Sequence, residues 1–509
     1  MDNSEKIGTV ISTQETPNSN EFSFVIRNDS KVVKKNQFIS VETEEGNVIA
    51  RITDVLKTNK YFNRAESISE YEKEGKDIKE VFPTERWEYL IGEAKILGVW
   101  SDKNSSFERS SFPPSPGTKI TLSNEDILSS FLGFDQEKGL EIGKVSSHNL
   151  SAKLNMTKLL QKHLAILSIS GSGKSYLTSV LFEELLDRNP EDGQVATIVI
   201  DTHGEYSGFA DDERYMGKTN LIKGKDFKIG VPSITSSQIS EFLPKLSRAQ
   251  RRELDRMFSE IRNEKRGSTY DLDDVLDKVK SDEKIKTSTQ DVLISLLGRL
   301  KNTGFFGVSD NPNLNELAKP GQLTVLDVSD LLSFRKRQML ASYIARKLFN
   351  ARRQEKVPPF LLVFEEAHNF APENVSRENA ISKGIIEKIA REGRKFNACL
   401  CLISQRPVNL STTAISQCNT HIFLRITNPY DLDHIKKSSE GLTSDVLNTI
   451  TSLRVGEALV VGGAVNYPVF LKVRERKSKE SEMGTPLEEA ARKYTENKEQ
   501  DRKDAKSFM

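Results

Sequence analysis

The stretch that decides the fold is HLAILSISGSGKS, residues 163–175. An apolar run of strand character passes into a glycine-rich segment that ends in Lys174 and Ser175. This order is typical of a phosphate-binding loop, which joins a β-strand to an α-helix. The backbone N–H groups of such a loop, together with the N-terminus of the helix, bind phosphate oxygens. The stretch therefore predicts an α/β domain with a nucleotide site at a strand end.

Each part of this loop has an expected role. Lys174 is expected to reach the β- and γ-phosphates of ATP, and the Ser175 hydroxyl to bind Mg²⁺. The residues that we expect to bind the nucleotide are Gly171, Ser172, Gly173, Lys174, Ser175 and Tyr176. Ser168 stands where the common pattern begins with glycine, and a small residue fits there if its φ angle stays negative. A flexible glycine turn without a ligand is the alternative.

A second apolar run, in PPFLLVFEEAHNFAP (residues 358–372), ends in two adjacent carboxylates. Ligands of open α/β sheets bind at the carboxyl ends of the strands. Adjacent residues at a strand end face different ways, so one carboxylate can reach the metal and the other the attacking water. We assign Glu365 to the Mg²⁺ ligands and Glu366 to the general base. The alternative is an exposed acidic loop.

Two further strand ends carry polar residues. Gln405 follows the run ACLCLIS (residues 398–404) and is expected to sense the γ-phosphate, with an ordinary surface glutamine as the alternative. The stretch VIDTHGEY places Asp201, His203 and Glu205 after another strand, where they contact the site or serve the structure.

Composition limits the class of protein. The three cysteines among 509 residues are few and odd in number, which favours a reduced compartment. No apolar window approaches the roughly 18 residues of a membrane span, and the N-terminus lacks a signal-peptide pattern. We expect a cytoplasmic protein without a membrane partner. Because 74 basic residues balance 73 acidic ones, any DNA-binding surface must be a local patch.

The pattern of apolar runs predicts three regions. Residues 1–150 have short β-branched runs typical of a small antiparallel barrel or sandwich, interrupted by a charged helix or loop at 63–81. Residues 151–475 alternate strands and helices, which indicates a mostly parallel, doubly wound sheet, with a helical insertion at about 235–320. Residues 476–509 form a charged tail, poor in large apolar residues.

The ordered set of motifs resembles the HerA family of hexameric ATPases, relatives of the FtsK DNA translocases. The motifs are HLAILSISGSGKS, VIDTHGEY, FEEAHNF, IAREGRKF, ISQRP and RVGEALVVG, behind a small N-terminal β-barrel. The resemblance implies a RecA-like ATPase core behind a HAS-type barrel, in a ring that surrounds double-stranded DNA. It also implies that Arg391 is an arginine finger for the neighbouring subunit's nucleotide, assisted by Arg394. Without the family, both residues would be solvated arginines at a helix end.

We therefore expect an ATP-dependent double-stranded DNA translocase or helicase. The resemblance implies a homo-hexamer that works with a NurA-like nuclease or another effector protein, in DNA end processing or in antiviral defence. A nucleotide-regulated platform that recruits an effector and translocates little is the main alternative. A small-molecule kinase fits less well, because paired glutamates suit attack by water.

Overall fold

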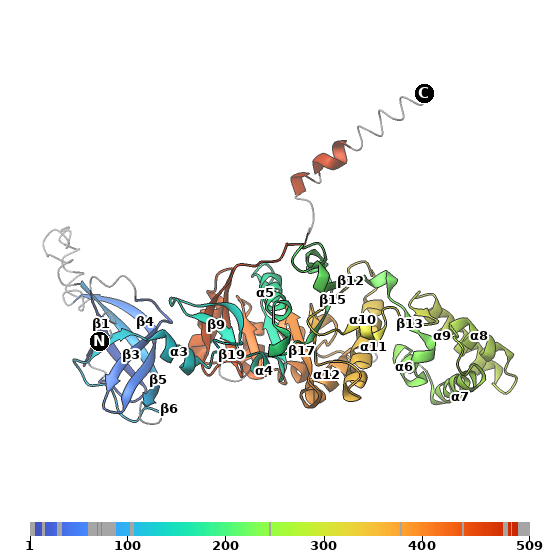
Figure 1. The fold of residues 1–509 in the computed structure, drawn as a ribbon, viewed down its shortest axis with the longest axis horizontal. Helices are drawn as coiled ribbons and strands as arrows, with labels where there is room; N and C mark the ends of the chain where they lie inside the picture. The colour runs from blue at the N-terminus through green and yellow to red at the C-terminus, as the bar shows by residue number, and fades with distance from the viewer. Residues whose placement is uncertain are drawn as a thin grey trace. The chain divides into compact units, whose positions relative to one another are not determined.

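The computed structural model describes most of the chain, in two compact units (Figure 1). The described residues are 6–12, 16–27, 33–59, 69, 73, 88–101, 106–243, 246–376, 379–439, 442–481, 487–489 and 491–496. The N-terminal unit comprises Met1–Asn155 and Glu457–Arg474, and the core unit comprises Met156–Gly456 and Glu475–Met509. None of the helices in the described residues has the length and apolar composition needed to cross a bilayer.

The N-terminal unit contains a closed antiparallel barrel. Its strands are β1 (Lys6–Ile11), β2 (Glu21–Ile26), β3 (Phe38–Thr43), β4 (Gly46–Asn59), β5 (Glu88–Ser101) and β7 (Lys119–Leu122). They pair in the order β2-β1-β7-β3-β4-β5, and β5 pairs with β2 to close the ring; β6 (Ser106–Glu108) extends β5. Phe24 fills the interior: a Cβ at Gly8 or Gly92 would lie 2.7 or 2.3 Å from its ring. Closure leaves few free strand edges.

A second, smaller set of strands completes this unit. It consists of β8 (Leu140–Val145), β9 (Ser151–Leu154), β19 (Glu457–Gly462) and β20 (Val469–Val473), after helix α3 (Glu125–Leu132). The strands pair antiparallel in the order β19-β20-β8-β9. Strands near the end of the sequence thus complete a sheet that begins near residue 140. The three-region division at residues 150 and 475 stays a prediction.

A parallel sheet is the centre of the core unit. In spatial order, its strands are β12 (Thr219–Lys223), β15 (Leu323–Asp327), β11 (Ala196–Asp201), β16 (Phe360–Phe364), β17 (Ala398–Ser404), β10 (Leu164–Leu167) and β18 (Thr420–Phe423). All of these neighbours run parallel. The five neighbouring strands β11, β16, β17, β10 and β18 are buried along their whole length. Such burial is typical of parallel strands with nearly continuous apolar runs.

Helices follow most of these strands. They are α4 (Met156–Leu160), α5 (Lys174–Leu186), α11 (Phe334–Arg353), α12 (Lys383–Glu392), α13 (Thr412–Ile415), α14 (Pro429–Ser438) and α15 (Ser444–Thr451). Short 3-10 helices lie at Pro190–Asp192, Ser207–Ala210, Met216–Lys218, Gly224–Asp226, Val231–Ser233, Ala367–Asn369, Gly393–Phe396 and Pro407–Asn409.

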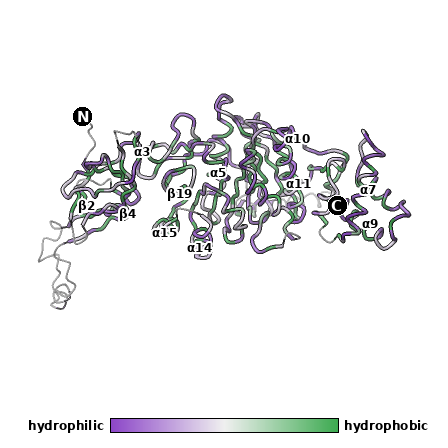
Figure 2. Tube along the Cα trace, turned by 90° about the horizontal axis from the view of Figure 1, so that it is seen from below, coloured by the Kyte–Doolittle hydropathy of each residue, from purple (hydrophilic) through white to green (hydrophobic). Residues whose placement is uncertain are grey.

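The helical insertion lies between β12 and β15 in the sequence. It contains α6 (Ser236–Phe242), α7 (Arg248–Glu264), α8 (Leu272–Ser281), α9 (Thr287–Lys301) and α10 (Leu314–Leu317), with the short pair β13 (Ile229–Gly230) and β14 (Phe306–Gly307). Helices α7, α8 and α9 pack together (Figure 1). Hydrophobic and hydrophilic residues alternate along α7 (Figure 2), which buries Leu254, Met257, Phe258 and Ile261.

The predicted fold class is confirmed. The structure has an N-terminal barrel, a parallel sheet that carries the glycine-rich loop, and helices in the predicted insertion. The charged stretch 63–81 lies outside the described residues, apart from residues 69 and 73.

Candidate active site

The glycine-rich loop joins β10, between β17 and β18 in the sheet, to helix α5. Gly171 and Gly173 have φ angles of 71° and 94°, in the left-handed region where side chains are strained. Ser172 closes the turn by donating from Oγ to the Ile169 carbonyl, at 2.8 Å. Ser168 is buried and its φ is not positive, so the condition set for a serine at this position is met.

Lys174 and Glu366, both predicted from the sequence to be catalytic, form a buried ion pair. Lys174 Nζ donates to Glu366 Oε1 at 2.8 Å, and both side chains are buried. Burial alone would lower the pKa of Lys174, but the charge of Glu366 and its hydrogen bond hold that pKa above the ordinary value. Glu366 has a φ of 49°, which is uncommon for a residue with a side chain and is typical of functional sites.

A histidine contacts the other oxygen of Glu366. His368 Nδ1 lies 3.3 Å from Glu366 Oε2 and 3.0 Å from Ser404 Oγ, at the end of β17. Burial lowers the pKa of His368, and the nearby Arg406 and Lys174 lower it further against the opposing effect of Glu366. The imidazole is therefore neutral at neutral pH and keeps Glu366 available as a base.

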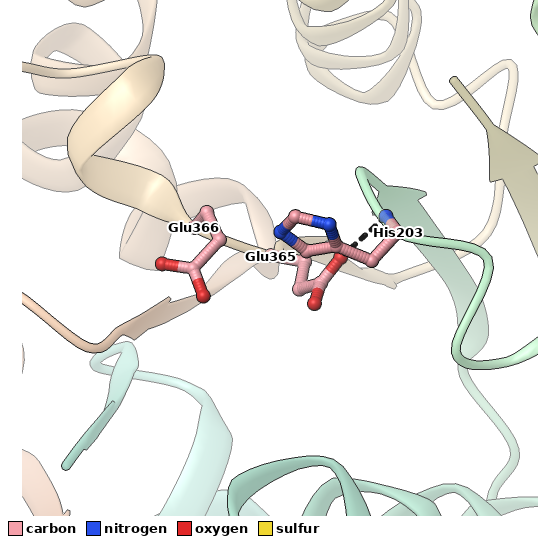
Figure 3. Close-up of side chains that lie close together, drawn as sticks. All are labelled: His203, Glu365 and Glu366. Atoms are coloured by element: carbon pink, nitrogen blue, oxygen red, sulfur yellow. Dashed lines mark hydrogen bonds between the residues drawn. The ribbon is translucent and has the colours of Figure 1, made fainter. Parts of the chain in front are cut away.

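Glu365 contacts the loop after β11. Its Oε2 accepts from Thr202 N at 2.7 Å and from Thr202 Oγ1 at 2.8 Å. It also accepts from His203 N at 3.3 Å (Figure 3). Its Oε1 is buried and has no hydrogen-bond partner among the described residues. Burial and the charges of Asp201 and Glu205 raise the pKa of Glu365 well above its ordinary value. A cation beside this carboxylate would relieve that cost.

Several side chains of this region offer atoms that could hold a hard divalent cation. Glu365 and Glu366 each offer a carboxylate oxygen and His203 offers a ring nitrogen, and these atoms lie within 4.8 Å of one another. Ser175 Oγ donates to Glu205 Oε2 at the start of α5. Serine and carboxylate oxygens are the ligands that Mg²⁺ prefers, so the residues fit the ion that a triphosphate brings.

The other predicted site residues lie at the same edge of the sheet or on its helices. Gln405 directly follows β17, the strand between β10 and β16. Tyr176, in the first turn of α5, accepts from Arg476 N at 2.6 Å. Arg391 is in the last turn of α12, and both it and Arg394 are exposed. Among the described residues, neither guanidinium makes a hydrogen bond or ion pair, as a finger for a neighbouring subunit requires.

Sequence reasoning missed three contributors. Thr202 lies inside the quoted VIDTHGEY stretch, and its place directly after a strand was the available signal. Ser404 is the last residue of an apolar strand, and a single serine there gave no separate signal. Residues 476–481, here called the C-terminal strap, contact α5 beside the loop and gave no sequence signal.

Comparison with known proteins places this site in a family. Residues 140–348 match the family model described as the central domain of helicase HerA. A probable helicase of Methanocaldococcus jannaschii is 27% identical, over 93% of this chain and 91% of that protein. The DNA double-strand break repair helicase HerA of Pyrococcus furiosus is 27% identical, over 78% of this chain and 80% of that protein.

A solved structure shows the same fold. VirB4 of Thermoanaerobacter pseudethanolicus superposes with a TM-score of 0.54 and 17% identity, over 68% of this chain and 99% of that chain. The match to the HerA central domain covers the glycine-rich loop and the strands β10 to β15, and the helicases align along most of the chain. Over most of its length the chain is therefore similar to HerA helicases.

Proposed function

We propose that this protein is an ATP-hydrolysing motor that assembles as a hexameric ring and moves along double-stranded DNA. The observation that carries the proposal is the buried contact between Lys174 of the glycine-rich loop and Glu366 at the end of β16. Similarity to HerA helicases supports the helicase class, and the names of the relatives in Pyrococcus furiosus and Saccharolobus solfataricus associate them with DNA double-strand break repair.

The residues would share the work of hydrolysis. The N–H groups from Gly171 to Tyr176 would bind the phosphates, and Ser175 and Glu365 would hold Mg²⁺, which neutralises phosphate charge when bound. Phosphate oxygens would compete with Glu366 for the Lys174 ammonium. Release from Lys174 would free the Glu366 carboxylate to accept a proton from the attacking water.

Two further residues would contact the γ-phosphate. Gln405 would contact it from the same subunit; its position directly after β17, between the strands of the loop and of Glu366, supports this role. Arg391 would contact it from the neighbouring subunit and stabilise the charge of the transferred phosphoryl group. Hydrolysis at one subunit would then depend on the position of the next.

The finer partners are part of the same proposal. We infer that the ring works with a NurA-like nuclease or another effector protein in DNA end processing, with antiviral defence as the other setting. The repair names of the relatives support the first setting. Co-purification of the full chain with a candidate nuclease, and stimulation of that nuclease by ATP, would test this part.

The deciding experiment is steady-state ATP hydrolysis with and without linear double-stranded DNA. We expect stimulation by DNA that Lys174→Ala and Glu366→Gln both abolish. Stimulation should also fall steeply between about 50 and 200 mM salt, because phosphate contacts release counterions. Hydrolysis that is indifferent to DNA and to salt would contradict translocation and favour the nucleotide-regulated platform.

A further inference from the structure

Glu205 is an acidic residue of the site whose role the proposed mechanism does not use. It is half-buried on the loop after β11, and its Oε2 accepts the hydrogen of the Ser175 hydroxyl. A serine that donates to a carboxylate keeps both oxygen lone pairs available and gains electron density on that oxygen. The contact therefore prepares Ser175 to bind a cation.

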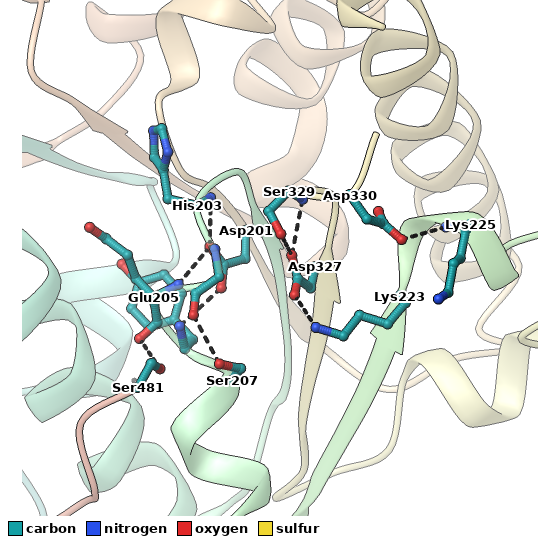
Figure 4. Close-up of polar contacts among 12 residues, drawn as sticks. Asp201, His203, Glu205, Ser207, Lys223, Lys225, Asp327, Ser329, Asp330 and Ser481 are labelled. Carbon is teal, nitrogen blue, oxygen red and sulfur yellow. Dashed lines mark hydrogen bonds and ion pairs between the residues drawn. The ribbon is translucent and has the colours of Figure 1, made fainter. Parts of the chain in front are cut away.

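A buried carboxylate fixes the loop that carries Glu205. Asp201 Oδ1 accepts from the backbone N–H groups of His203, Gly204 and Glu205, at 3.2, 2.8 and 3.2 Å. Asp201 Oδ2 accepts from Tyr206 N at 2.9 Å (Figure 4). Four hydrogen bonds to one side chain leave the loop little freedom, so Glu205 is held at Ser175 by the fold.

The C-terminal strap holds the same loop from its other side. Ser481 Oγ donates to the Glu205 carbonyl at 2.7 Å and accepts from Gly208 N at 2.9 Å (Figure 4). A Cβ at Gly208 would lie 2.7 Å from the Lys479 carbonyl, so the strap and the loop are in close contact. Two independent parts of the chain thus determine where the Glu205 carboxylate lies.

A second observation points to a ligand at this place. The Oε1 atom of Glu365 is buried without a hydrogen-bond partner among the described residues, while its Oε2 already has three donors. Glu205 is close enough for its charge to act on both Glu365 and Lys174. Ser175 and Glu205 are thus joined by a hydrogen bond beside Glu365, whose Oε1 is buried without a donor of its own among the described residues.

We propose that Glu205 is a third acidic residue of the nucleotide site, which orients the Ser175 hydroxyl and a water bound to Mg²⁺, and so sets the Mg²⁺ dependence of ATP binding. This inference rests on the proposed function. Glu205 acts from outside the ion's direct ligands, because Mg²⁺ keeps several waters and one oxygen of Glu205 is already engaged by Ser175. Such outer partners typically change metal affinity about 10–100-fold.

The test measures the affinity of the full chain for a fluorescent, non-hydrolysable ATP analogue, with Mg²⁺ and with EDTA. The readout is the ratio of the two dissociation constants. Glu205→Gln keeps an acceptor for Ser175 but removes the charge, so affinity in EDTA should stay or rise while affinity with Mg²⁺ falls. We expect the ratio to drop about 10–100-fold. A ratio equal to that of the wild type would overturn the inference.

Matched variants separate charge from structure. Glu213→Gln makes the same change at an exposed acid eight positions along the chain, and should leave the ratio unchanged. Glu205→Asp keeps the charge and should stay within about threefold of the wild-type ratio; a loss as large as in Glu205→Gln would overturn the inference. Wild-type protein that binds no nucleotide in either buffer would instead defeat the proposed function.

Discussion

At the scale of single residues, Lys174 and Glu366 form a buried pair of opposite charges. The hydrogen bond between them is 2.8 Å long and shielded from water, and the charge of Glu366 holds the pKa of Lys174 above its ordinary value. Loss of one partner leaves the other as a buried, unpaired charge, which is strongly destabilising. Lys174→Ala is therefore a more disruptive change than Glu366→Gln, which keeps a polar acceptor for the lysine.

Glu366→Gln is expected to separate binding from hydrolysis. The amide competes less well than the carboxylate for the Lys174 ammonium, so ATP should bind at least as tightly as in the wild type. Turnover should fall roughly 10²–10⁴-fold, because the amide cannot accept the proton of the attacking water. Equilibrium binding and single-turnover hydrolysis measure the two effects. Turnover that persists in the variant would remove Glu366 from the role of general base.

The stability of the core unit is expected to depend on pH through His163, which lies just before β10. Its Nε2 donates to the Ala390 carbonyl, and its Nδ1 accepts from Leu400 N, both at 3.0 Å. Burial lowers the pKa of His163 from 6.5 to about 4. The neutral ring is the form that both hydrogen bonds require, so the folded chain resists its protonation.

Acid should destabilise the protein through this residue. Above pH 6.5 the ring is neutral in the folded and unfolded chains, and below that pH only the unfolded chain takes up the proton, down to the folded pKa of about 4. Over this window the free energy of unfolding should fall by up to about 3 kcal/mol. His163→Asn, which tolerates the φ of 64°, should flatten this slope in urea unfolding curves. An unchanged slope would contradict the assignment.

At the scale of elements, the C-terminal strap is part of the nucleotide-binding fold. Its backbone supplies Lys477 N and Ser478 N, and its side chain Ser478 Oγ, to Oε1 of Glu183 on α5, at 2.8, 2.8 and 2.7 Å. Glu183 is fully buried, so these donors balance a charge that has lost its water. The strap therefore stabilises the helix that begins with Lys174.

Two truncations test the strap. Ending the chain after Glu475 removes all three donors to Glu183 and should cost at least about 1–3 kcal/mol, with weaker ATP binding. Ending it after Ser481 keeps those donors and the contact with Glu205, so melting temperature and ATP affinity should match the full chain. Equal behaviour of the two truncations would show that the strap contributes nothing to the site.

The strand ends of the site were predictable and the strap was not. Each buried parallel strand has a nearly unbroken apolar run, so the polar residue that ends it, such as Asp201 or Glu365, marks the carboxyl edge of the sheet. The strap is polar and has no periodic pattern, and its position depends on a glutamate buried in a distant helix. The pairing of β20 with β8 joins residues more than 300 positions apart, which no local pattern encodes.

At the scale of the whole molecule, the proposed ring divides each catalytic site between two subunits. Lys174, Glu365 and Glu366 come together within one chain, whereas Arg391 is exposed at the end of α12. A guanidinium directed to solvent adds nothing to the chemistry of its own site. It becomes catalytic only if assembly brings it to the nucleotide of a neighbour.

Mixing two inactive variants tests this division. Lys174→Ala subunits cannot hydrolyse ATP but still present Arg391, and Arg391→Ala subunits keep a complete nucleotide site but lack the finger. Neither variant alone should exceed about 0.1% of wild-type hydrolysis, given the 10³–10⁵-fold effect of such fingers. Reassembled together, they should regain activity. In a mixed ring, the intact nucleotide site of an Arg391→Ala subunit can face the intact Arg391 of a neighbouring Lys174→Ala subunit. Gel filtration establishes that rings form. Mixed rings without activity would mean that Arg391 acts within its own subunit or only supports the end of α12.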